Sequence, residues 1–241
     1  MENTNYTLHK SQDRGFSNHG WLNSAFSFSF AHWYEPTRMG FETLRVINDD
    51  IIDAQNGFGF HPHQDMEIVT IIFEGELTHQ DTMGNKEVIK PGEVQRMSAG
   101  TGVLHSEMNH SQSKVKLFQI WIEPKEFGLK PSYEQKYFDS KKRFNTFQLL
   151  VSPDGRNDSL SINQEAYISR ITLKEGGEVK YKKLGEDTSI YLMVVDGDII
   201  VDSYELSSRD ALGVKGKKTI ELISSSESDV IIFEIQNKKT N

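Results

Sequence analysis

The sequence predicts an all-β protein made of two tandem β-barrels, and three observations support this fold class. Helical periodicity is scarce, and short apolar stretches alternate with turn-forming residues along the chain. The second half repeats the order of apolar stretches and glycines found in the first half. The length of 241 residues suits one large all-β domain or two of ordinary size. Many short strands at this spacing are typical of a sandwich or barrel.

The first half contains a series of apolar stretches that end at turn signals. The strand at 44–48 is expected to end at Asp49-Asp50, and the strand at 67–73 is expected to end before Gly75. Further strands are expected at 77–80, 87–89, 94–97 and 115–122. The last of these is apolar on both faces, as expected for a strand buried between two sheets.

The composition changes in the middle of the chain, where residues 124–142 are polar, charged and interrupted by two prolines and a glycine. We interpret this stretch as the connection between two units. The N-terminal barrel with its linker is therefore assigned to residues 1–138, and the C-terminal barrel to residues 139–241.

A weak internal repeat relates the two units. An apolar strand at 68–73 precedes Gly75, and an apolar strand at 190–195 precedes Gly197. The second copy has no histidine, because all eight histidines lie within the first 110 residues. Only the first barrel is therefore expected to carry a histidine site, and the second is expected to be structural or an interaction surface.

The composition excludes several classes of function. A net charge of −8 and a pI near 5.5 argue against a broad surface for nucleic acid or anionic membranes. The absence of cysteine excludes disulfides, thiolate metal sites and cysteine nucleophiles. No apolar stretch approaches the length of a membrane span, and the N-terminus has no apolar signal segment. We expect a soluble cytoplasmic protein that binds neither nucleic acid directly nor membranes.

Two pairs of potential metal ligands are the most informative motifs of the chain. His61 and His63 are two residues apart, and so are His105 and Glu107. Side chains in a β-strand alternate between faces, so the members of each pair point the same way. Two such strands that meet inside a barrel would bring three imidazoles and a carboxylate to one point. This donor set suits one divalent first-row metal ion.

Several residues near these motifs have two interpretations. Histidine pairs on strands are more often surface or core residues than metal ligands. Glu67 has the same parity as the first histidine pair, so geometry alone leaves either Glu67 or Glu107 as the carboxylate ligand. His79 and Asp81 can orient a ligating imidazole by a hydrogen bond, but a satisfied polar pair in the hairpin is the favoured interpretation. For the alternating rings at 26, 28 and 30, core packing is favoured over an aromatic wall for a substrate.

These motifs match the two cupin motifs, and the chain resembles the pirin family. Pirins are bicupin proteins that include bacterial quercetin 2,3-dioxygenases. The resemblance covers most of the chain; it is dense from about Trp21 to Phe138 and looser thereafter. Further segments similar to the family's N-terminal signature and loops lie at 27–31, 33–36, 44–50, 79–85 and 97–102.

The resemblance implies both the fold and the metal ligands. Each barrel is expected to be a jelly-roll cupin. The ligands of the family fall on His61, His63, His105 and Glu107, and all four residues are present. The pirin pattern therefore favours Glu107 as the carboxylate ligand, with Glu67 behind it. Fe(II) is the favoured ion, and Mn, Ni, Cu, Co and Zn are the alternatives.

The resemblance also implies a reaction. A flavonol such as quercetin would bind through its 3-hydroxyl, and dioxygen would cleave the heterocyclic ring to give a depside and carbon monoxide. Glu107 is the expected acceptor of the hydroxyl proton. The alternative is a non-enzymatic regulatory protein in which the bound metal alters the surface presented to a protein partner. Both functions require the same four ligands, so the sequence does not choose between them.

Overall fold

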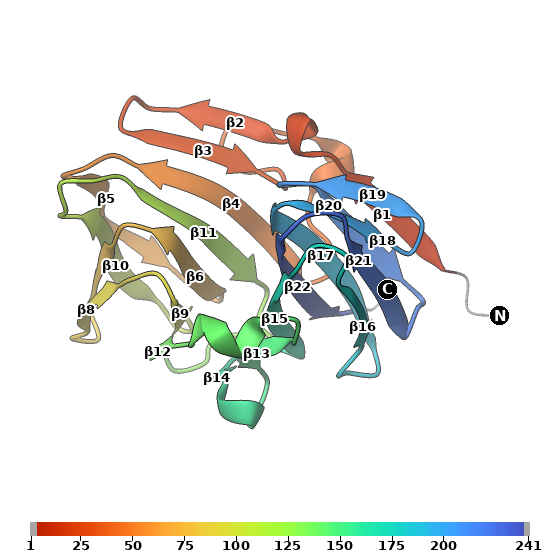
Figure 1. The fold of residues 1–241 in the computed structure, drawn as a ribbon. Helices are drawn as coiled ribbons and strands as arrows, with labels where there is room; N and C mark the ends of the chain where they lie inside the picture. The colour runs from red at the N-terminus through yellow and green to blue at the C-terminus, as the bar shows by residue number, and fades with distance from the viewer. Residues whose placement is uncertain (1–3, 239–241) are drawn as a thin grey trace.

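Two barrels of similar build lie side by side in the computed structural model, which describes residues 4–238 (Figure 1). Each barrel consists of one seven-stranded and one four-stranded sheet. The predicted all-β fold of two tandem barrels is confirmed. The helices are short 3-10 turns, and none of those described is long and apolar enough to cross a membrane. They are η1 (Ser11–Asp13), η2 (Pro36–Arg38), η3 (Ser140–Arg143) and η4 (Arg156–Asp158).

The strands of the N-terminal barrel are β2 (Gly15–Asn18), β3 (Leu22–Phe26), β4 (Leu44–Ile52), β5 (Asn56–His63), β6 (Glu67–Glu74), β7 (Leu77–Asp81), β8 (Lys86–Ile89), β9 (Glu93–Ser98), β10 (Val103–Asn109), β11 (Val115–Ile122) and β12 (Ser132–Tyr137). The large sheet has the order β12-β9-β6-β11-β4-β3-β2, and the small sheet has the order β5-β10-β7-β8. The two predicted ligand pairs therefore lie on adjacent strands of the small sheet.

The strands of the C-terminal barrel are β13 (Gln148–Ser152), β14 (Leu160–Ser161), β15 (Ala166–Leu173), β16 (Glu178–Lys182), β17 (Thr188–Asp196), β18 (Asp198–Val201), β19 (Tyr204–Ser207), β20 (Ala211–Lys215), β21 (Thr219–Ser224) and β22 (Ser228–Gln236), together with β1 (Asn5–His9) from the N-terminus. The sheet orders are β1-β20-β17-β22-β15-β13-β14 and β16-β21-β18-β19. Strands β16 and β21 thus correspond to β5 and β10.

The first strand crosses to the other barrel. The sequence analysis assigned residues 1–138 to the N-terminal unit, but β1 pairs with β20 and adds an edge strand to the C-terminal sheet. The side chains of β1 account for this position. Tyr6 packs against Tyr204, and His9 Nδ1 lies 3.0 Å from the buried hydroxyl of Tyr191.

The segment interpreted as a connection also contributes a strand. Strand β12 pairs with β9 and closes the edge of the large sheet in the N-terminal barrel, whereas residues 124–142 were expected to hold no regular element. Its pairing residues are mostly half-buried and polar, which explains why hydrophobic periodicity did not reveal it. In the N-terminal barrel, β12 occupies the place that β1 occupies in the C-terminal barrel.

Strand β4 continues past its predicted end. Asp49 and Asp50 lie inside the strand because both carboxylates have partners. Asp49 forms ion pairs with Arg14 and Arg209, at 3.1 and 2.8 Å. Asp50 is buried and accepts a hydrogen bond from Ser24. Two consecutive aspartates therefore line opposite faces of one strand instead of ending it.

The core is distributed differently in the two barrels. One large apolar cluster joins both barrels and includes Val69 and Ile71 of β6 together with Tyr191 and Phe233 of the C-terminal sheet. A second apolar cluster fills the interior of the C-terminal barrel, where Leu222 and its neighbours occupy strands equivalent to those that carry the histidines. The interior of the N-terminal barrel, in contrast, contains polar side chains and a cavity.

Candidate metal centre

Three histidines converge inside the N-terminal barrel. His61 and His105 are directly paired across β5 and β10, and His63 lies on the same face as His61, as the alternation of side chains predicts. The ring centroids are 4.4 Å apart for His61 and His105, 5.0 Å for His61 and His63, and 4.9 Å for His63 and His105. Each imidazole offers one nitrogen, and these nitrogens lie within 4.8 Å of one another. In the described part of the chain, this is the one group of at least three His, Cys, Asp or Glu side chains with this geometry.

Hydrogen bonds fix which nitrogens face the centre. His61 Nδ1 lies 2.8 Å from the carbonyl oxygen of Gly59, so it carries the proton and leaves Nε2 free. His105 Nδ1 lies 3.4 Å from His79 Nδ1, and His79 Nε2 lies 3.0 Å from the carboxylate of Asp81. In the proton arrangement that satisfies this series, each histidine donates a proton toward Asp81. The Nε2 atom of His105 is buried and has no partner among the described residues, as a metal-binding atom requires.

The electrostatics keep the imidazoles of His63 and His105 neutral. Burial lowers the pKa of His105 to about 2, and the neighbouring histidines add to this effect. Burial also lowers the pKa of His63 to about 4, with a further contribution from His61. Neutral imidazole is the form that binds metals. The three side chains therefore fit a divalent transition-metal ion.

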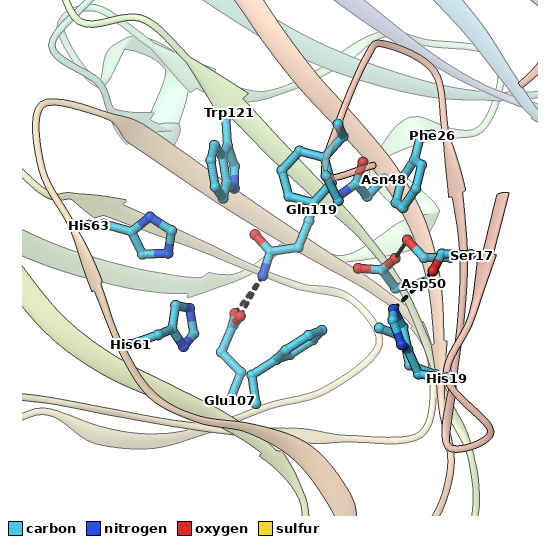
Figure 2. Close-up of a pocket in the computed structure, with 15 residues that line it drawn as sticks. Ser17, His19, Phe26, Asn48, Asp50, His61, His63, Glu107, Gln119 and Trp121 are labelled. Carbon is cyan, nitrogen blue, oxygen red and sulfur yellow. Dashed lines mark hydrogen bonds between the residues drawn. The ribbon is translucent and has the colours of Figure 1, made fainter. Parts of the chain in front are cut away.

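Glu107 lines the same cavity but is not a member of the histidine group. Both of its carboxylate oxygens accept a hydrogen bond from Gln119 Nε2, each at 2.7 Å (Figure 2). Burial raises the pKa of Glu107 to about 7; the hydrogen bond from Gln119 opposes this rise, and the nearby Asp50 adds to it. The structure thus brings together three of the four predicted ligands, with the fourth turned toward a neighbour.

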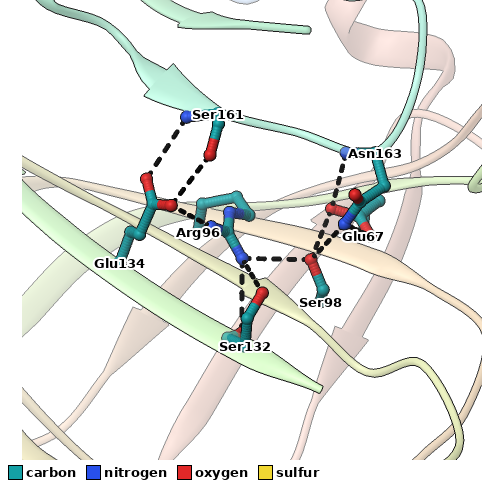
Figure 3. A network of polar contacts seen from close by, with 7 residues as sticks. All are labelled: Glu67, Arg96, Ser98, Ser132, Glu134, Ser161 and Asn163. Atoms are coloured by element: carbon teal, nitrogen blue, oxygen red, sulfur yellow. Dashed lines mark hydrogen bonds and ion pairs between the residues drawn. The ribbon is translucent and has the colours of Figure 1, made fainter. Parts of the chain in front are cut away.

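The other two residues considered from the sequence lie in different places. His79 is beside His105, as described above. Glu67 points away from the cavity and accepts hydrogen bonds from Ser98 and from Asn163 of the C-terminal half (Figure 3). Its expected contact with the ligating histidines is therefore not found. The alternation of side chains along β5 does not continue into β6, so Glu67 does not share a face with His61 and His63. Asp65 adopts a left-handed conformation between the two strands, with φ of 49°, and the strands belong to different sheets.

A cavity of about 310 Å³ opens onto His61 and His63. Its walls are mostly apolar, and Trp121 contacts His63 edge-on, with ring centroids 4.9 Å apart. The rings of Phe26 and Phe30 line it, whereas Phe28 is buried in the core between the barrels. The three rings do not share one face, because β3 ends at Phe26.

Sequence reasoning missed the polar residues of this cavity. The side chains of Asp50, Asn48 and Gln119 line it from β4 and β11, and Ser17, Ser24 and His19 line it from the segment around β2 and β3. Asn48 and Asp50 lie in the segment 44–50 that resembles the family's signature, but no metal-ligand motif marks any of the six residues. Their common signal is polarity at inward positions of strands that are otherwise apolar.

Two jelly-roll-type barrels, of which only one shows a histidine centre among the described residues, define the class of bicupin proteins. Comparison with known proteins agrees with this class. A family model described as Pirin matches residues 8–122, and one described as the Quercetinase C-terminal cupin domain matches residues 149–235. The chain belongs to the pirin family, as its motifs predicted.

Similar proteins include one named quercetin 2,3-dioxygenase from Escherichia coli K12, which is 44% identical over 95% of this chain and 97% of its own length. A pirin-like protein from Caulobacter vibrioides is 40% identical over 91% of this chain and 95% of its own length. The structure of the bacterial pirin YhhW from Escherichia coli in complex with nickel(II) superposes with a TM-score of 0.91, at 41% identity, covering 97% of this chain and 100% of that one.

Proposed function

We propose that this protein is a metal-dependent dioxygenase that cleaves the heterocyclic ring of flavonols such as quercetin. The observation that carries the proposal is the apolar cavity that opens directly onto the histidine centre. A flat, mostly aromatic molecule suits walls formed by phenylalanine and tryptophan rings. The name of the Escherichia coli relative supports the same substrate class.

His61, His63 and His105 would hold one divalent metal ion, with Glu107 as the fourth ligand after a rotation of its side chain away from Gln119. We propose Fe(II) as the ion, because a set of imidazole and carboxylate donors suits it. The bound ion supplies Lewis acidity, which lowers the pKa of a coordinated substrate hydroxyl.

Glu107 performs the proton transfer in this proposal. Burial raises the pKa of the Glu107 carboxyl to about 7 while it is hydrogen-bonded to Gln119, which makes it a stronger base than an exposed glutamate. Before the metal binds, Gln119 holds this carboxylate in the cavity. The apolar walls exclude water around the reacting ring. In the overall reaction, one flavonol and one dioxygen molecule give one depside and one carbon monoxide molecule.

The test is turnover of quercetin by protein reconstituted with each of Fe(II), Mn, Ni, Cu, Co and Zn. Loss of quercetin absorbance, uptake of dioxygen and release of carbon monoxide should occur together, fastest with Fe(II). His61→Ala should abolish all three signals, and His110→Ala, a change at an exposed histidine, should leave them unchanged. If no ion supports cleavage, the proposal is overturned, and the regulatory alternative with a protein partner replaces it.

A further inference from the structure

A buried carboxyl group lies across the cavity from the histidines. Asp50, on β4, is only 3% exposed and lines the cavity. Its Oδ1 accepts a hydrogen bond from Ser24, while Oδ2 has no hydrogen-bond partner among the described residues. Figure 2 shows this second oxygen directed into the space between Asp50 and the side chains of Glu107 and His61.

The cavity that Asp50 faces has both apolar and polar walls. Its apolar residues include Leu22, Phe26 and Phe30, and its polar residues include Ser17, Ser24 and His19. Burial raises the pKa of Asp50 to about 7; the hydrogen bond from Ser24 opposes the rise, and Asp49 adds to it. A buried carboxyl with an unused oxygen is destabilising unless a partner reaches it, and this partner has to enter from the cavity.

Asp49, the neighbouring residue on the opposite face of β4, differs from Asp50 because its carboxylate has charged partners. Asp49 has two arginine partners, Arg14 and Arg209, on the face toward the C-terminal barrel. No lysine or arginine is among the residues that line the cavity, and Nε2 of His19, which also lines it, lies 2.9 Å from the hydroxyl of Ser17. The second oxygen of Asp50 therefore has no donor among the described residues, and a phenolic hydroxyl that enters the cavity can supply one.

We propose that Asp50 is a specificity-determining residue that accepts a hydrogen bond from a phenolic hydroxyl of the substrate, at a ring position remote from the group that binds the metal. This inference rests on the proposed function and narrows it to polyhydroxylated flavonols. The metal centre binds the 3-hydroxyl, which all flavonols share, and Asp50 selects among them by their other hydroxyls. Binding at two separated points also fixes the orientation of the ring in the cavity.

The inference is tested by binding of quercetin and of 3-hydroxyflavone, which keeps the 3-hydroxyl but lacks the others. Quenching of tryptophan fluorescence is measured on the metal-loaded protein under nitrogen, so that no turnover occurs. The wild type should bind quercetin roughly tenfold more tightly than 3-hydroxyflavone, as expected for a hydrogen bond to a buried carboxyl. Asp50→Ala should reduce this preference to near unity, mainly by weakening quercetin binding.

Two variants provide the controls. Asp50→Asn keeps the shape and the contact with Ser24, and it should show a weaker preference with unchanged metal content. Asp49→Asn makes the same substitution at the neighbouring position on the opposite face of β4, and it should keep the full preference. Equal binding of the two flavonols by the wild type, or a preference that persists in both Asp50 variants, would overturn the inference.

The outcomes also separate this inference from the proposed function. Preferential binding of quercetin that depends on Asp50, without cleavage once air is admitted, would support the inference and contradict the dioxygenase. If wild type and Asp50→Ala cleave both flavonols with the same preference between them, the dioxygenase is supported and the inference about Asp50 is contradicted. Absence of binding of either flavonol to the wild type would overturn both.

Discussion

Replacing Glu107 by glutamine separates its chemical role from its structural role. The carboxylate is 3% exposed, and its two oxygens accept hydrogen bonds of 2.7 Å from the same amide nitrogen of Gln119. The Oε1 atom of Gln119 is buried without a partner. In Glu107→Gln the introduced carbonyl oxygen can still accept from Gln119 Nε2, so one hydrogen bond is retained. We expect the free energy of unfolding to change by less than about 1.5 kcal/mol.

The effect on catalysis should be much larger. The substitution removes the charge and the basicity of the group proposed to accept the substrate proton. We expect turnover per bound metal to fall by roughly 10²-fold or more, with a smaller change in KM. The assay is quercetin consumption with dioxygen uptake, divided by the metal content of each preparation. Metal binding itself should weaken, because a neutral amide is a poorer ligand than a carboxylate.

Glu67→Gln is the matched control, since Glu67 is equally buried but faces Asn163 and Ser98 at the contact between the two halves. It should lower stability by roughly 1–3 kcal/mol, because a buried charged acceptor loses strong hydrogen bonds. Its turnover per bound metal should stay close to that of the wild type. The reasoning is refuted if Glu107→Gln retains most of its activity per metal while Glu67→Gln is inactive and poor in metal.

Three further predictions concern the metal and the stability of the fold. Elemental analysis should give one transition metal per chain for the wild type and none for His105→Ala or His61→Ala; a second tightly held ion would contradict the assignment. Asp81→Asn should weaken metal affinity by roughly 10–100-fold in a competition titration, because a neutral amide accepts the hydrogen bond from His79 less strongly than the carboxylate does, and His79 in turn orients His105 by accepting from its Nδ1; unchanged affinity would exclude this role. Burial lowers the pKa of His9 to about 4, with a contribution from a nearby arginine, so the unfolded chain takes up this proton first on acidification. The contribution of His9 to the free energy of unfolding is fully present above about pH 6.5. It is lost as the pH drops to about 4, and the loss is roughly 3 kcal/mol at most. Thermal unfolding of His9→Gln should depend less on pH in this window than that of the wild type in the same metal state, and identical slopes would show that His9 does not contribute.

The metal centre could be predicted from the sequence because its geometry is mostly local. The alternation of side chains in a strand requires only that His61 and His63 belong to one strand, and Gly59 next to them provides the carbonyl that orients a ring. A run of mostly apolar residues likewise predicted the buried strand β11, although it did not reveal that Gln119 of this strand faces the cavity. The repeat of glycines and apolar stretches was likewise sufficient for the two-barrel fold, and the lack of histidines after His110 predicted which barrel carries the centre.

Tertiary structure alone decided the features that depend on which strands pair and pack. Strand β1 lies in the C-terminal barrel, where it pairs with β20. This pairing could not be predicted, because the two strands are about 200 residues apart and nothing in the five residues of β1 specifies that sheet edge. Glu67 faces the other half, rather than the metal centre, because one left-handed residue and a change of sheet reset its orientation. Asp50, which resembled part of a turn, faces the cavity because a hydroxyl from β3 and the opposite barrel wall create a buried polar position for it. Local periodicity determines which side chains share a face, but long-range packing determines what that face meets.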